Sequence, residues 1–185
     1  MKETINNLFK KIKTSKLLKA QIAVIIICLF FGTLLHFTYE WSGENFFVGI
    51  FSAVNESVWE HLKLVFYPML IMGIIEYFYV KDIVNNYLEA KTIGIFSAMS
   101  FIITSFYTYT GIIGTKFLII DVLIFIISII VGEWVAYKLM TRKDESTTLS
   151  TVLSIGILLF FLISFTIFTY SPPTANLFIE YKNLM

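Results

Sequence analysis

Both histidines of the chain lie in one polar stretch between two long apolar segments. The stretch runs from His36 to Lys63 and also holds two of the three tryptophans. Its four carboxylates are Glu40, Glu44, Glu56 and Glu60. Imidazole nitrogens and carboxylate oxygens are ligands for zinc and related divalent ions, and imidazole also exchanges protons near neutral pH. Polar side chains at the edge of a bilayer are costly, so this stretch is the leading candidate for a functional site.

The spacing within the stretch indicates which side chains converge. His36 and Glu40 are four residues apart, so they share one helix face, with Tyr39 beside them. In an antiparallel helical hairpin, His61 would lie at the same depth as His36. For a divalent metal such as zinc, the ligands predicted from this spacing are His36, Glu40, Glu56 and His61. A broader ligand-binding set adds Tyr39, Asn55, Glu60 and Asp121, and no catalytic residue is assigned.

Some of these polar residues also have structural explanations. Ser57 and Glu60 fit a capping box, in which each side chain satisfies a backbone N–H of the other residue. Glu56 gains from the positive end of the same helix. Asp121 fits either a helix cap or a pair with Lys116. Three interpretations of the stretch therefore stay open: a metal site, a ligand or proton site, and a network that only fixes the hairpin.

The composition identifies the elements that must position these residues. Of the 185 residues, 57% are hydrophobic and 15% are charged, and the mean hydropathy is +0.80. Soluble domains carry about 25% charged residues. Apolar runs long enough to cross a bilayer predict an all-α integral membrane protein, with a single transmembrane domain over 1–185. About five spans are expected, near 20–40, 57–80, 92–110, 116–138 and 149–170, with a short interfacial segment at 45–54.

The basic residues predict the orientation. Eleven of the 14 lie in the N-terminal segment and in the two loops on the same side, and three lie on the other side: Lys63, Lys116 and Lys182. The positive-inside rule then puts the N-terminus in the cytoplasm and the C-terminus outside, with the candidate site on the outer face. On the inner side, we expect Glu76 and Glu133 to reach toward Lys81 and Lys138. The net charge of +1 gives no indication of nucleic-acid binding.

Two motifs and the C-terminal region carry a resemblance to a known family. HFTYEWSG precedes VNESVWEHLK, and FTYSPP with a following LF lies near the C-terminus. With these motifs the chain resembles a family of small prokaryotic polytopic membrane proteins described as a domain of unknown function. The resemblance implies a polytopic membrane protein and supplies no activity, substrate or cofactor.

The leading functional prediction is a multi-pass protein of the cell membrane that binds a small polar or cationic ligand in an outward-facing site. Five spans leave little room for the inverted repeats of a full carrier, so transport would require a homo-oligomer or a partner membrane subunit besides the lipid bilayer. The alternative is a metal-dependent hydrolase or transferase at the outer leaflet. A structural or accessory protein is the third alternative, and whether the chain is an enzyme stays open.

Overall fold

The computed structural model describes residues 2–142 and 145–180, with side chains from Lys11 onward. The described residues form helices and connecting segments, with no strand among them. The helices are α1 (Lys2–Trp41), α2 (Phe46–Gly49), α3 (Val58–Val80), α4 (Tyr87–Ile113), α5 (Leu118–Met140), α6 (Thr148–Tyr170) and the short 3₁₀ helix η1 (Asn176–Phe178).

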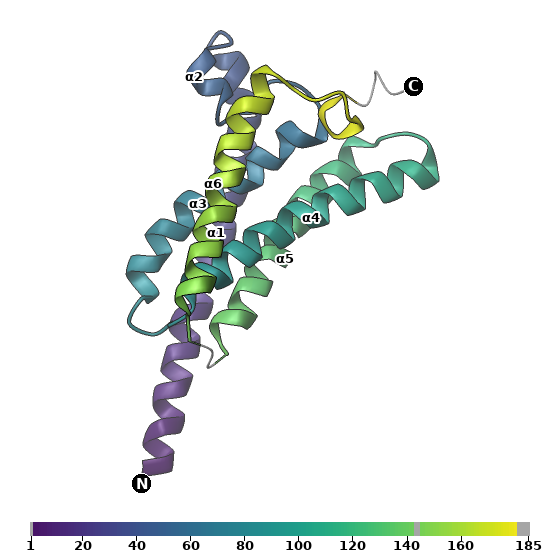
Figure 1. Cartoon of the computed structure of the whole chain (residues 1–185). Helices are drawn as coiled ribbons and strands as arrows, with labels where there is room; N and C mark the ends of the chain where they lie inside the picture. The colour runs from purple at the N-terminus through teal and green to yellow at the C-terminus, as the bar shows by residue number, and fades with distance from the viewer. Residues whose placement is uncertain (1, 143–144, 181–185) are drawn as a thin grey trace.

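Five of these helices, α1 and α3 to α6, are long and apolar enough to cross a membrane. The expectation of an all-helical chain with about five such helices is confirmed, and the architecture is that of a multi-pass membrane protein. The start of α1 extends beyond the other helices, at the end of the molecule opposite α2 and η1 (Figure 1). One boundary differs in an informative way. The third long helix begins at Tyr87 rather than near residue 92, so Lys91 is helical and buried.

Small residues let the long helices approach closely at two crossings. A Cβ atom on Gly94 of α4 would lie 2.7 Å from the carbonyl oxygen of Gly132 of α5, and the reverse distance is also 2.7 Å. At the second crossing, a Cβ on Gly32 of α1 would collide with the Leu64 carbonyl of α3 and would lie 2.7 Å from the Phe125 ring. Close backbone approach is the usual role of small residues between membrane helices.

The turn into α3 is capped by two side chains. Ser57 is the N-cap, and its hydroxyl accepts a hydrogen bond from the Glu60 backbone N–H. The Asn55 side chain accepts a hydrogen bond from the Ser57 N–H. In the predicted capping box, the Glu60 carboxylate would accept that hydrogen bond. The capping box is therefore half right. The Glu60 carboxylate instead accepts from the Val54 backbone N–H, so it fixes the segment before the helix.

A buried lysine also binds the segment before α3. Lys63 of α3 is fully buried, and its ammonium lies 2.6 Å from the Glu60 carboxylate. The ammonium also donates hydrogen bonds to the carbonyl oxygens of Gly49, at 2.8 Å, and Ser52, at 3.1 Å. The Thr169 hydroxyl of α6 lies 3.2 Å from the same carboxylate. Glu60 and Lys63 thus tie the connection between α2 and α3 to the helical core.

A second buried charge cluster lies farther along α3. The ammonium of Lys91 on α4 is 2.7 Å from the carboxylates of both Glu76 on α3 and Glu133 on α5. The expectation that these glutamates reach outward to Lys81 and Lys138 is therefore wrong. Both glutamate side chains are buried inside the bundle, where a charge without a partner would be very costly. They therefore pair with the buried Lys91.

Candidate metal site

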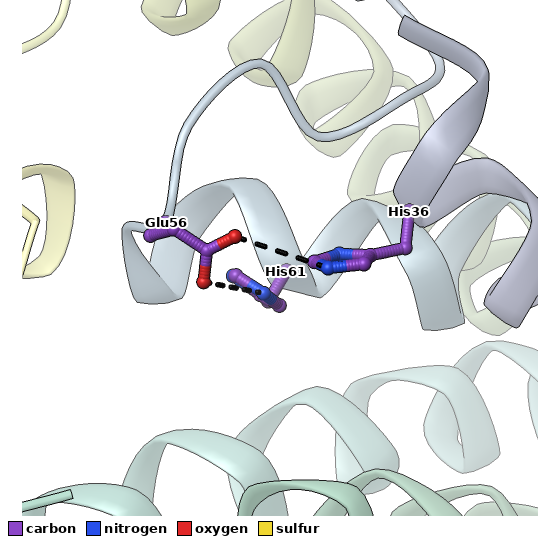
Figure 2. A group of neighbouring side chains, drawn as sticks. All are labelled: His36, Glu56 and His61. Carbon is purple, nitrogen blue, oxygen red and sulfur yellow. Dashed lines mark ion pairs between the residues drawn. The ribbon is translucent and has the colours of Figure 1, made fainter. Parts of the chain in front are cut away.

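The two histidines and one glutamate converge where α1 packs against the start of α3. His36 comes from α1, His61 from the first turn of α3, and Glu56 from the segment just before it (Figure 2). The imidazole centroids lie 5.2 Å apart. One Glu56 oxygen is 3.8 Å from His36 Nε2, and the other is 3.7 Å from His61 Nε2. The predicted convergence of the histidines at equal depth therefore matches the geometry.

The hydrogen bond of His61 fixes the direction of its free ring nitrogen. Its Nδ1 lies 2.8 Å from the Ser57 backbone carbonyl, which can only accept, so Nδ1 carries a hydrogen and donates it. In neutral imidazole, Nε2 then presents a lone pair toward the Glu56 carboxylate. Two electron-rich groups facing each other favour a cation between them, either a metal ion or a proton on Nε2. A backbone carbonyl on the far ring nitrogen is also the usual support for a metal-bound histidine.

The ligand atoms lie somewhat farther apart than in a closed tetrahedral site. Each of the three residues offers one ligand atom, and these atoms lie within 4.8 Å of one another. Zinc at about 2.1 Å from each ligand implies ligand-to-ligand distances of about 3.4 Å. Small side-chain movements would therefore close the set. All three side chains are partly exposed, with 32% for His36, 50% for Glu56 and 31% for His61, so an ion can reach them from solution.

The three residues line a pocket of about 630 Å³. Two further charged residues line the pocket, Lys116 before α5 and Asp121 in its first turn. Most of the remaining wall is apolar, and examples are Leu64, Ile102, Phe106, Ile124 and Phe125. The pocket therefore combines a few charged side chains with a mostly apolar wall, which is the polarity of a site for an amphipathic molecule.

The other predicted site residues lie outside the His36–Glu56–His61 group. Glu40 is exposed and acts on His36 electrostatically, although it shares the helix face of that residue. Tyr39 binds the Ser52 hydroxyl through its backbone N–H. Asn55 and Glu60 are engaged in the turn into α3. Of the broader set, Asp121 alone shares the pocket with the group, and it accepts a hydrogen bond from the Tyr109 hydroxyl.

Two residues of the site were not predicted from the sequence. The sequence offers Lys116 as a partner for Asp121, but the Lys116 ammonium lies 3.8 Å from Glu56. Gly32 sits one turn before His36 and allows α1 to touch α3 there, which brings the two imidazoles together. A glycine one helical turn from a polar residue in an apolar span was the available signal for this close approach.

Comparison with known proteins places the chain in a family without assigning an activity. The model of the Family of unknown function (DUF6512) matches residues 9–183, so the chain belongs to that family. No curated protein and no solved structure matches the chain.

Proposed function

We propose that this member of the DUF6512 family binds one divalent transition-metal ion, of which zinc is the leading candidate, through His36, Glu56 and His61. The observation that carries the proposal is the opposed arrangement of His61 Nε2 and Glu56, with the His61 Nδ1 hydrogen committed to a backbone carbonyl. An ion between these groups would replace a repulsive contact with two ligand bonds. Imidazole and carboxylate together are typical zinc ligands.

In this proposal the site lies on the extracytoplasmic side of the cell membrane. The bias of Lys and Arg supports that orientation, because most of them lie toward the N-terminal side of the bundle. The whole chain acts as one transmembrane domain that takes a cation from outside. If the bound ion is transported, a second copy of the chain or a partner membrane subunit completes the route.

The metal content of protein purified without chelators tests the proposal. We expect about one zinc per chain in the wild type, and loss of that zinc in His36→Ala and His61→Ala. Lys116→Met is the matched control, because it removes the other partner of Glu56 without removing a metal ligand. The control should bind zinc at least as tightly as the wild type. A wild type that stays metal-free in excess zinc contradicts the proposal, as does zinc retained by both histidine variants.

A second candidate function is a metal-dependent hydrolase or transferase, and the pocket favours it. Three protein ligands leave one position of a tetrahedral ion open for water, as in catalytic zinc sites. That position would face a pocket with a mostly apolar wall, which Lys116 also lines. The substrate class that fits is an amphiphile with an anionic head and a hydrocarbon chain. Metal-dependent release of the head group from such lipids in vesicles, abolished in Glu56→Gln, would support this function over binding alone.

A further inference from the structure

The buried Lys91 cluster is a second polar site that the proposed metal site does not use. It consists of Gln21 from α1, Glu76 from α3, Tyr87 and Lys91 from α4, and Glu133 from α5. All five side chains are buried, and the most exposed, Tyr87, has 6% of its surface accessible. Four helices thus direct polar groups to one point in the bundle.

The charges of the cluster do not balance. Lys91 supplies one positive charge, and Glu76 and Glu133 together supply two negative charges when ionised, which leaves a net charge of −1. The thiol of Cys28 on α1 lies within electrostatic range of all three groups and contributes no positive charge. A buried ion costs several kcal/mol unless it is paired. One additional positive charge would therefore stabilise the cluster.

The hydrogen bonds of Tyr87 show where that charge belongs. The hydroxyl oxygen lies 2.7 Å from the Gly73 carbonyl and 2.8 Å from Glu76 Oε2. A hydroxyl has one hydrogen, so it cannot donate to both acceptors. If Glu76 is protonated, its O–H donates to the Tyr87 oxygen, and the Tyr87 hydroxyl donates to the Gly73 carbonyl. Both short contacts then contain one hydrogen each.

Within the described chain, two further oxygen atoms of the cluster have no hydrogen to accept. Glu133 Oε1 and Gln21 Oε1 are buried, and neither has a hydrogen-bond partner among the described residues. The other polar atom of each side chain does have a partner. Glu133 Oε2 accepts a hydrogen bond from Lys91, and Gln21 Nε2 donates one to Glu76. Glu133 therefore already carries one oxygen that no described hydrogen-bond donor stabilises, and a second full negative charge on Glu76 beside it would raise the cost of burying the cluster further.

We propose that the Glu76–Glu133 pair binds one proton inside the bundle. The two carboxylates share this proton beside the ammonium of Lys91, and its hydrogen bond runs from Glu76 to Tyr87. The two carboxylates, Lys91 and the proton then sum to zero charge. The proton is bound by the folded chain at neutral pH and is released on unfolding, when the glutamates ionise in water. Linkage therefore makes the folded state less stable as the pH rises toward deprotonation of the pair.

Infrared spectroscopy of the full chain in lipid tests this inference directly. The wild type at neutral pH should show the C=O stretching band of a buried protonated carboxyl, and the band should disappear at alkaline pH. Glu76→Gln and Glu133→Gln should each abolish the band, because either change leaves Lys91 with one carboxylate and no net charge. Glu40→Gln, at an exposed position, should leave the band intact.

The thermal midpoint provides the second measurement. It should fall with rising pH in the wild type, and this fall should be absent in both glutamine variants. Absence of the band from the wild type at neutral pH overturns the proposal, even if the variants fail to fold. A midpoint that rises when sodium replaces potassium at constant ionic strength also overturns it, because the site would then hold a metal cation. Neither result bears on the His36–Glu56–His61 site.

Discussion

Replacing Lys63 by methionine should unfold the connection that presents Glu56. Lys63 is fully buried, and its ammonium contacts the Glu60 carboxylate and the carbonyl oxygens of Gly49 and Ser52. Methionine has a similar length and keeps most of the packing, so the change removes chiefly the charge and its three hydrogen bonds. The Glu60 carboxylate, 2% exposed, would be left without its counter-charge.

The expected loss follows from that uncompensated charge. Removing one partner of a buried ion pair costs about 3–5 kcal/mol. For a chain of this size, each kcal/mol corresponds to about 2–4 °C, so the thermal midpoint should fall by about 6–20 °C. Part of the loss should be recovered in Lys63→Met combined with Glu60→Gln, because the double variant buries no unpaired charge. Lys81→Met, at an exposed position on α3's C-terminal side, should change the midpoint little.

Thermal unfolding of the four proteins in the same detergent measures these values. Zinc affinity should also fall in Lys63→Met, since Glu56 is carried by the segment that Lys63 holds in place. A midpoint within about 2 °C of the wild type, equivalent to less than 1 kcal/mol, would refute the reasoning. So would a double variant less stable than Lys63→Met alone, because the cost would then not come from an unpaired Glu60.

Three further predictions concern the site and the helix crossings. Zinc affinity should fall as the pH is lowered, because a protonated imidazole cannot bind the ion and protons therefore compete with zinc for His36 and His61. A calorimetric titration that shows no loss of affinity under acidic conditions would contradict this. Glu56→Gln should weaken zinc binding by at least about tenfold, since one carboxylate ligand is lost, and equal affinity would exclude Glu56 as a ligand. Gly94→Ala should lower the free energy of unfolding by about 1–3 kcal/mol, because the added Cβ collides with the α5 backbone. Gly156→Ala is the control: its Cβ meets no atom within 4 Å, so the change should be neutral or stabilising. Equal effects of the two changes would argue against a close crossing.

The sequence predicted the long helices and the pairing of the histidines, because both depend on local features. Apolar runs specify spans, and a hairpin brings residues at equal distances from its turn to equal depth. The choice among the carboxylates needed the three-dimensional structure. Glu40 shares the helix face of His36, but Glu56 in the turn lies between the rings. Local spacing does not reveal how far a turn folds back over the helix that follows it.

The buried charges were the least predictable feature. A lysine next to an apolar run usually marks the end of a span, and the span predicted near 92–110 leaves Lys91 just outside it. Its partner Glu133 is 42 residues away in the sequence, so no local pattern connects the two. The rotation of α4 and α5 about their axes decides whether these side chains face lipid or each other. That rotation is set by the close contact at Gly94 and Gly132, which depends on both helices at once.

The most direct test of the metal proposal is anomalous X-ray scattering at the zinc edge from crystals of the wild-type protein grown with zinc. We predict an anomalous peak at about 2.0–2.2 Å from Nε2 of both His36 and His61 and from one Glu56 oxygen. The peak should be absent from crystals of His61→Ala. A fully occupied zinc elsewhere, with none between these three side chains, would contradict the account.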